Sequence, residues 1–341
     1  MRFLRQYVQE ANQAVNRKDD RVALVLMDRP MADSSPDIHS WSPTDLLAAQ
    51  AEWRIDLSSE SPVVQQPMQL SAGSLEWQDY LGAPDLCGLE YLREQLGSLF
   101  RGKYGLVLLH VDSRIDDDAM RLLTLLLGRA MGKNVAPEAA GEHRPLFAIT
   151  ATGDSTIGGR YGGNGRNAKF LAMHTDGSGI HSGRVDIMGL LCLQAAREGG
   201  LTRLADSRAA YQRLSNERQR LLGAPIPRTD PYATRLPAEQ LTRRPVFEAR
   251  APGDCAPVFS YHPQRVRDGL RAANGAIEPA LEQALSELDS ELAQGAAEIL
   301  LERGDILLVD NSTIAHGRTA FEDDPARPRF IERLWIEVGA L

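Results

Sequence analysis

The sequence predicts a mainly β fold with flanking helices (α+β), built as a distorted double-stranded β-helix, the cupin-like jelly roll. Two observations favour this fold. Short apolar runs bounded by turn-forming Gly, Pro, Asp and Asn recur at residues 185–196, 245–249, 257–261, 298–301, 305–310 and 333–338. Helical segments are few in this part, at residues 207–222 and 277–292, so strands do not alternate regularly with helices as in a parallel βα fold.

The first hundred residues precede the predicted roll and favour helices. Apolar residues recur at helical spacing in residues 3–15 and again in residues 46–53. Residues 58–73 are rich in Ser, Pro and Gln, a composition that fits either a linker or a lid over a site. Residues 89–100 have a helical period that ends before Gly102.

The roll is expected to begin at residues 105–111, a dense apolar run typical of a buried strand. Asp116 follows as a candidate N-cap, and the apolar residues after it recur at helical spacing until Gly132, a typical helix stop. We expect this helix to pack on the sheet.

Length and composition predict one core. At 341 residues the chain could form one large domain or two of average size. Hydrophobic residues make up 43% and charged residues 25%, which is close to the average of globular proteins and leaves ample apolar surface to bury. We expect residues 1–100 to form a helical N-terminal portion and possible lid, and residues 101–341 to form the jelly-roll core.

Charge and cysteine content exclude some partners and compartments. The net charge of −8 argues against nucleic acid, because binding a phosphate backbone needs a concentrated basic face. The N-terminus lacks the apolar run of a signal peptide, and no stretch approaches the ~20 apolar residues of a membrane span. The three cysteines are far apart and form no CxxC spacing, which favours a reducing cytoplasm.

A pair of side chains in the segment FLAMHTDGSG is typical of a metal site. His174 and Asp176 are two residues apart, and such residues on an extended chain point the same way. A third ligand must come from elsewhere, and the apolar run ILLVDNSTIAH ends in His316. Asp310 and Asn311, just before it, could orient this histidine by hydrogen bonds, although both residue types also favour turns.

Two histidines and one carboxylate on one face of a metal ion leave coordination positions open, the arrangement associated with non-heme iron(II) oxygenases. Zinc hydrolases can use the same donors, so the triad alone leaves the metal open. Arg329 and Arg333 follow His316 by 13 and 17 residues. Arginine is the residue suited to bidentate carboxylate recognition, which indicates an acidic small molecule beside the metal.

The chain resembles the taurine and 2,4-dichlorophenoxyacetate dioxygenase (TauD/TfdA) superfamily, and within it the clavaminate-synthase-like branch. The resemblance rests on motifs in a set order: an HxD/E pair, a Gly-Gly-x-Thr element, a distal histidine and an arginine shortly after it. This sequence supplies them as His174 with Asp176, Gly199-Gly200-Leu201-Thr202, His316 and Arg329. The matching region covers roughly residues 169–338.

The resemblance implies an activity and the residues for it. The catalytic iron(II) would be held by His174, Asp176 and His316. Arg329 and Thr202 would bind the distal carboxylate of the co-substrate 2-oxoglutarate, and Arg333 would be a second anchor, for co-substrate or substrate. With O2, such an enzyme oxidises, most often hydroxylates, an unactivated C–H bond and releases succinate and CO2. Residues 1–341 would then be a single catalytic domain.

The expected substrate is a small, carboxylate-bearing molecule such as an amino acid or natural-product intermediate. Arg333 is one candidate for contact with it, and Arg166 and His181, in Gly-rich segments on either side of the HxD pair, are two more. Asp176 argues against halogenation, because related halogenases have a small residue there, and the clavaminate-synthase branch often has Glu at this position.

Two other interpretations use the same residues. A zinc-dependent hydrolase or isomerase on the same fold would have no use for a keto-acid anchor such as Arg329. A non-catalytic jelly-roll module that binds a ligand would fold without any metal dependence. Trp335 is expected to pack in the core, and His262, before a proline, is expected in a turn. The number of subunits is left open.

Overall fold

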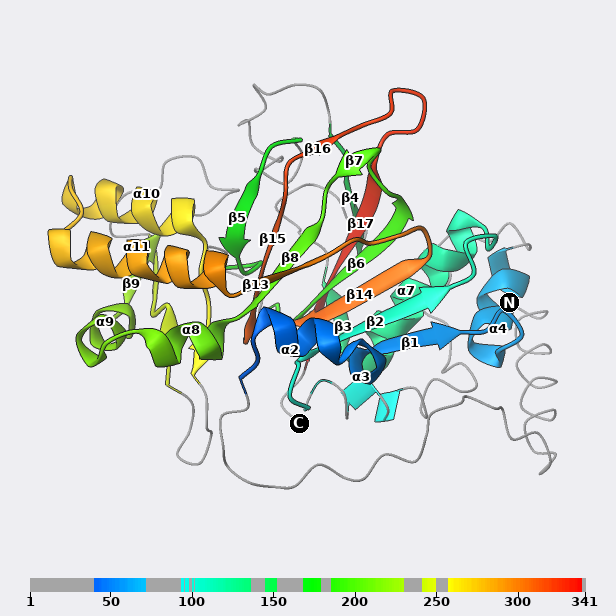
Figure 1. Ribbon diagram of the computed structural model, residues 1–341, viewed down its shortest axis with the longest axis horizontal. Coiled ribbons are helices and arrows are strands. Elements are labelled where there is room, and N and C mark those ends of the chain that lie inside the picture. The colour runs from blue at the N-terminus through cyan, green and yellow to red at the C-terminus, as the bar shows by residue number, and fades with distance from the viewer. Residues whose placement is uncertain are drawn as a thin grey trace.

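A seven-stranded sheet forms the centre of the fold (Figure 1). The structure is a computed structural model that describes residues 40–71, 93–94, 96–97, 100, 102–135, 145–151, 168–178, 185–229, 241–249 and 257–338. The strands follow the order β1 (Arg54–Leu57), β2 (Leu106–Val111), β14 (Asp305–Asp310), β6 (Ile187–Gln194), β17 (Phe330–Glu337) and β3 (Lys133–Val135), and β4 (Leu146–Ile149) also pairs with β17. Among the described strand pairs, β1 and β2 run parallel and the others antiparallel.

A smaller sheet of four strands lies next to it. Its order is β13 (Ala296–Ile299), β8 (Thr202–Asp206), β15 (Ile314–Arg318) and β5 (Leu171–His174). Three two-stranded ribbons complete the described β structure: β9 (Ile226–Arg228) with β10 (Thr242–Arg244), β11 (Phe247–Glu248) with β12 (Val258–Phe259), and β7 (Glu198–Gly199) with β16 (Phe321–Glu322). The mainly β, two-sheet architecture predicted from the strand pattern is confirmed.

Alternate residues of the central strands enter two different cores. On β2, Leu106 and Leu108 belong to the core between the two sheets, which also contains Leu204 of the smaller sheet. Val107 and Leu109 belong to the core on the outer face of the larger sheet. Successive side chains of a strand point to opposite faces, so the near-continuous apolar run at residues 105–111 identifies a strand buried on both sides.

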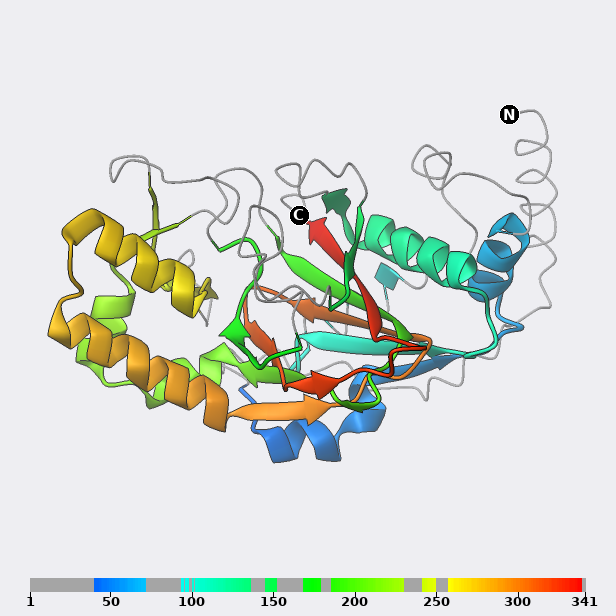
Figure 2. The same cartoon turned by 90° about the horizontal axis from the view of Figure 1, so that it is seen from above.

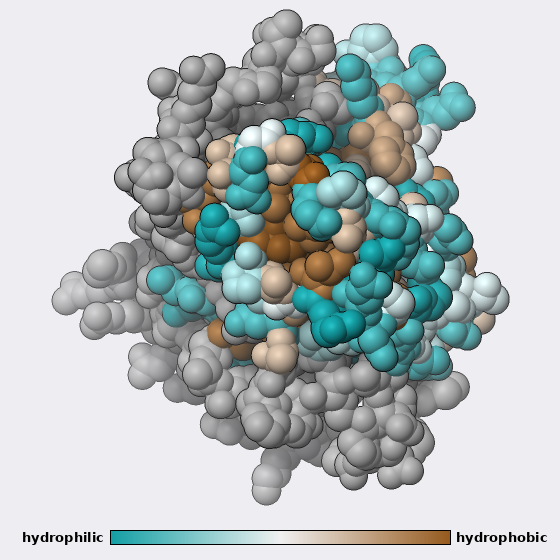
Figure 3. All heavy atoms as spheres, turned by 90° about the vertical axis from the view of Figure 1, so that its left-hand side faces the viewer, coloured by the Kyte–Doolittle hydropathy of each residue, from teal (hydrophilic) through white to brown (hydrophobic). Residues whose placement is uncertain are grey.

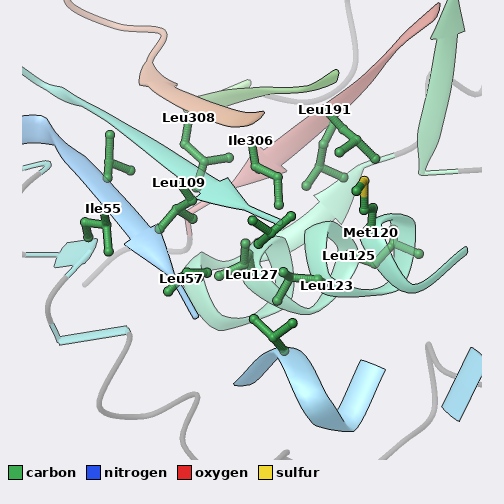
Figure 4. Close-up of a cluster of buried hydrophobic side chains, with 14 of the residues drawn as sticks. Ile55, Leu57, Leu109, Met120, Leu123, Leu125, Leu127, Leu191, Ile306 and Leu308 are labelled. Carbon is green, nitrogen blue, oxygen red and sulfur yellow. The ribbon is translucent and has the colours of Figure 1, made fainter. Parts of the chain in front are cut away.

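The outer core is covered by α7 (Asp117–Met131) and α4 (Pro62–Ser71) (Figure 4). The Asp116 side chain accepts a hydrogen bond from the Ala119 N–H and begins α7, and Gly132 ends it. This is the helix predicted from the sequence. The Ser-, Pro- and Gln-rich segment at residues 58–73 was expected as a linker or lid. Its described part contains α4, which packs against α7 and adds Val63, Val64 and Met68 to the outer core.

Helices also cover the outer face of the smaller sheet: α8 (Ser207–Arg213), α9 (Asn216–Leu222), α10 (Pro263–Asn274) and α11 (Pro279–Gln294). The predicted helix at residues 207–222 is divided by Ser215, which caps α9, and α10 was not predicted. Figures 1 and 2 place α10 and α11 at one end of the molecule and α7 and α4 at the other. Seen from the α10–α11 end, hydrophobic atoms show within a largely hydrophilic surface (Figure 3).

The predicted helix at residues 46–53 is present as α2 (Pro43–Ala48) and α3 (Gln50–Trp53). The one predicted at residues 3–15 lies outside the described residues. Within the described part of the chain, no helix is long and apolar enough to cross a membrane.

Candidate metal centre

The predicted metal ligands meet at the end of the smaller sheet. His174 is the last residue of β5, and it lies directly opposite His316 of the neighbouring strand β15. Asp176 follows in the turn after β5. All three side chains are buried, and one ligand atom from each lies within 4.8 Å of the others. Cross-strand pairing therefore brings together the HxD pair and the distal histidine, as the sequence predicted.

The two imidazoles are poised to act as ligands. The Nδ1 of His174 donates to the Ala172 carbonyl at 2.9 Å, which leaves its Nε2 with the free lone pair. This Nε2 is 3.8 Å from Oδ1 of Asp176, and the Nε2 of His316 is 3.9 Å from Oδ2. Burial lowers the pKa of both histidines, that of His316 to about 3, so both are neutral and able to bind a metal ion.

The carboxylate of Asp176 is ionised although it is buried. Burial by itself would raise its pKa, but the charge of Arg333 and the two histidines outweigh burial and hold the pKa at about 2. One carboxylate and two neutral imidazoles, converging within a buried space, fit a divalent metal ion that keeps open positions.

The backbone of Asp176 is held by one side chain, Asn311. The Asn311 Oδ1 accepts from the Asp176 N–H at 2.9 Å, and its Nδ2 donates to the Asp176 carbonyl at 3.0 Å and to the Val185 carbonyl at 2.8 Å. The sequence had suggested that Asp310 and Asn311 orient His316. Instead Asn311 fixes Asp176, and Asp310 accepts from Ser312 and Thr313 in its own turn.

Two side chains of β17 donate to the carboxylate of Asp176. The Arg333 Nη1 donates to Oδ1 at 2.9 Å, and the Trp335 indole Nε1 donates to Oδ2 at 2.8 Å. Residues two apart on a strand share a face, which places both donors toward the triad. Trp335 packs in the inter-sheet core as expected, but its hydrogen bond to a metal ligand was not foreseen.

The predicted co-substrate residues lie beside the Gly199-Gly200 turn. The φ angles of Gly199 and Gly200 are +72° and +69°, and a Cβ on Gly199 would lie 2.3 Å from the Ala320 carbonyl oxygen. Only glycine allows this turn, which leads into the buried Thr202. Arg329 lies against it, because its Nε is 3.5 Å from the position of a Cβ on Gly200.

Arg329 is a buried cation, 5% exposed. Its guanidinium stacks on Phe321 at 5.2 Å, and no carboxylate of the described residues forms an ion pair with it. Burial lowers its pKa. Arg318, on the same face of β15 as His316, stacks on Phe321 at 4.7 Å. We call Arg318, Phe321 and Arg329 the arginine cluster, and a buried cluster of this kind favours an anion.

Three further residues were singled out in the sequence: His262, Arg166 and His181. His262 was expected in a turn, but it is the N-cap of α10 and its ring is 5.1 Å from that of His174. Its Nδ1 is buried without a hydrogen-bond partner among the described residues, and burial lowers its pKa to about 3. Its position could not be predicted because it depends on contacts distant in sequence. Arg166 and His181 lie outside the described residues.

Comparison with known proteins links the chain to one family. The model of the taurine catabolism dioxygenase TauD, TfdA family matches residues 83–335. The FR-33289 synthase of Streptomyces rubellomurinus (strain ATCC 31215) is 28% identical over 205 residues, covering 54% of this chain and 58% of that protein. The uridine-5'-phosphate dioxygenase of a Streptomyces sp is 31% identical over 173 residues, 47% of this chain and 59% of that protein. The alignments thus span less than two thirds of these relatives.

Solved structures share the fold. Asparagine oxygenase in complex with Fe(II), 2S,3S-3-hydroxyasparagine and succinate is 19% identical, with a TM-score of 0.64 over 83% of this chain and 93% of that chain. The non-heme iron oxygenase OrfP in complex with Fe and alpha-ketoglutaric acid is 16% identical, with a TM-score of 0.61 over 83% and 93%. The overall fold of this chain is therefore the fold of these oxygenases.

Proposed function

The chain belongs to the TauD, TfdA family of dioxygenases, and from that premise we propose that it is an iron(II)- and 2-oxoglutarate-dependent oxygenase. One observation carries the proposal: a buried triad of two neutral histidines and an ionised aspartate, together with the buried Arg329, which forms no ion pair with any carboxylate of the described residues. Of the two alternatives, a zinc hydrolase would need the triad but not the buried arginine. A non-catalytic binding module would need neither feature.

The metal would be held by His174, Asp176 and His316. Iron bound there supplies the oxidation of a substrate C–H bond by O2, coupled to decarboxylation of 2-oxoglutarate to succinate and CO2. The chain's own part is to keep both imidazoles neutral, to fix the carboxylate through Asn311, Arg333 and Trp335, and to bury the triad away from bulk water.

The co-substrate would bind through Arg329 and Thr202. A buried guanidinium lacks the solvation that it has in water, so a carboxylate that pairs with it removes a large electrostatic cost. Thr202 adds a hydroxyl donor from the first residue of β8. Both residues lie beside the Gly199-Gly200 turn, where the backbone of Gly199 passes close to the Ala320 carbonyl.

The substrate would be a small, carboxylate-bearing molecule, such as an amino acid or a natural-product intermediate, and the reaction a hydroxylation. Arg333 supports this, because it is a partly exposed cation beside the triad, with 18% of its side chain accessible. The names of the relatives are compatible with this, since asparagine bears a carboxylate group and uridine-5'-phosphate a phosphate group. Arg333 is the proposed contact, with Arg166 and His181 as further candidates from the segments around the HxD pair.

We propose that the chain acts as a single catalytic domain in the cytoplasm, with residues 101–341 as the catalytic core. In the described part of residues 1–100, β1 extends the central sheet and α4 covers the outer core, so these two elements are not a lid over the substrate. The family match over residues 83–335 supports one catalytic unit. The net charge of −8 supports a small molecule rather than nucleic acid as the partner.

An anaerobic titration tests the function without a known substrate. Metal-free protein receives Fe(II) and then 2-oxoglutarate, and a visible charge-transfer band of the keto-acid chelate is the expected result. Asp176→Ala, run in parallel, should weaken the band because one ligand is lost. Absence of the band in wild-type protein that is folded and has taken up iron would overturn the proposal.

A further inference from the structure

The carboxylate of Asp176 has two different donors, one on each oxygen. Oδ1 accepts from the Arg333 guanidinium, and Oδ2 accepts from the Trp335 indole. We infer that Trp335 is a positioning residue of the metal site, whose indole N–H fixes the Asp176 carboxylate in the orientation that meets the two histidine nitrogens. This inference rests on the proposed function, because it takes the triad to be the metal site.

Trp335 is held firmly enough to do this. It is 5% exposed, and strand β17 pairs it with Met188 of β6 on one side and with Val135 of β3 on the other. A buried indole N–H needs a partner, and the hydrogen bond to Asp176 is the one that the structure provides. Strand pairing therefore fixes the indole, and the indole fixes the carboxylate.

The two donors differ in how easily a ligand can draw them away from Asp176. Arg333 is a long, charged and partly exposed side chain, so an anionic substrate can attract it away from Asp176. Trp335 is neutral and enclosed in the inter-sheet core, so no ligand competes for it. Each carboxylate oxygen has two lone pairs, and Oδ2 can accept from Trp335 while the carboxylate still binds a metal ion. The orientation of Asp176 would then survive any movement of Arg333.

Trp335 also supports the other donor. The Arg333 guanidinium lies over the indole ring, 4.7 Å from its centre. Replacement by phenylalanine keeps an aromatic ring under Arg333 but removes the N–H, whereas replacement by leucine removes both. The two variants separate the hydrogen bond from the stacking contact.

The test is an anaerobic titration of metal-free protein with Co(II), read by visible absorption. Trp335→Phe is expected to bind Co(II) roughly 10- to 100-fold more weakly than wild type, the usual effect of losing a hydrogen-bond partner of a metal ligand. Its ligand-field spectrum should also change, because the carboxylate can rotate. Trp335→Leu should bind no more tightly than Trp335→Phe.

Trp53→Phe is the matched control. Trp53 lies in the same core cluster, is 1% exposed, and its indole Nε1 donates at 2.8 Å to the Leu46 carbonyl rather than to Asp176. It should lose a comparable amount of thermal stability and keep wild-type Co(II) affinity and spectrum. Equal Co(II) binding by Trp335→Phe and wild type, or equal losses in Trp335→Phe and Trp53→Phe, would overturn the inference.

If Trp335→Phe does not fold, an NMR measurement on protein that keeps Trp335 tests the inference instead. The chain has four tryptophans, so the 15N-indole spectrum has few cross-peaks, and Trp41→Phe, Trp53→Phe and Trp77→Phe identify the Trp335 signal by elimination. Asp176→Ala should shift this signal and leave that of Trp53 in place. An unchanged Trp335 signal would contradict the inference. Wild-type protein that takes up no Co(II) would overturn the metal site itself, which is a different failure.

Discussion

Asp176 and the arginine cluster are both buried and both charged, but they are satisfied in opposite ways. Every hydrogen-bonding group of Asp176 has a partner: Asn311 binds its N–H and carbonyl, and Arg333 and Trp335 bind its carboxylate. Arg329 has an aromatic ring beside it and no carboxylate from the described residues. Under the proposed function, the carboxylate is oriented before the metal binds, whereas the guanidinium is left for 2-oxoglutarate to neutralise.

The difference corresponds to two kinds of ligand. A metal ion needs donor atoms already in place, because orienting them at the moment of binding costs affinity. A dicarboxylate brings its own charge, and a buried cation that it neutralises gives a large gain on binding. The largest expected effects therefore come from changing the two charged groups, and smaller ones from their neighbours.

Arg329→Met should weaken binding of 2-oxoglutarate to the iron-loaded protein by about 2–4 kcal/mol, because a buried charge pair loses one partner. Anaerobic titration of the charge-transfer band measures the dissociation constant. Arg327→Met is the control, since Arg327 is exposed and donates to Gln194. Equal affinity in Arg329→Met and wild type would remove Arg329 from the co-substrate site.

Asn311→Ala should lower the free energy of unfolding by about 2 kcal/mol, because it leaves the buried N–H and carbonyl of Asp176 without partners. Urea denaturation of the metal-free protein measures this loss. Metal affinity should fall as well, since the backbone of Asp176 is no longer fixed. Asn311→Asp keeps the acceptor and loses the donors. If neither variant changed the free energy of unfolding or the metal affinity, Asn311 would not support the site.

The metal-free protein should lose stability as pH falls from about 6.5 toward 3. The pKa of His316 and that of His262 are lowered to about 3 from 6.5, so the unfolded chain takes up protons in this range and the folded protein does not. Each histidine should contribute roughly 1.4 kcal/mol per pH unit. Urea denaturation at several pH values measures the slope, which His262→Gln should reduce. A flat profile would mean that the folded histidines are protonated.

Phe321→Leu should have the smallest effect. It removes the aromatic surface under Arg318 and Arg329, whose guanidiniums are 4.7 and 5.2 Å from the ring centre. We expect 2-oxoglutarate affinity to fall by about 1 kcal/mol. Phe259→Leu, in the core beside α10 and α11, is a control of similar size and burial. A loss as large as that of Arg329→Met would mean that Phe321 holds the cluster together.

The triad could be predicted because each part of it has a local signal. The HxD spacing is a property of one strand, and the distal histidine ends a recognisable apolar run. The roles of Asn311 and Trp335 could not, because each depends on a partner more than a hundred residues away. Helix α10 was missed since its sequence is largely polar and only Val266, Gly269 and Leu270 are buried.

The positions of these residues in the sequence also determine when the site can form during synthesis of the chain. β5 ends with His174, but His316 of β15, Arg329, and Arg333 and Trp335 of β17 are all synthesised well over a hundred residues later. A nascent chain therefore cannot assemble the proposed metal site until β15 has been synthesised. Truncated products that end before β15 carry only the HxD pair, so they should not bind iron tightly enough to generate oxidants in the cell.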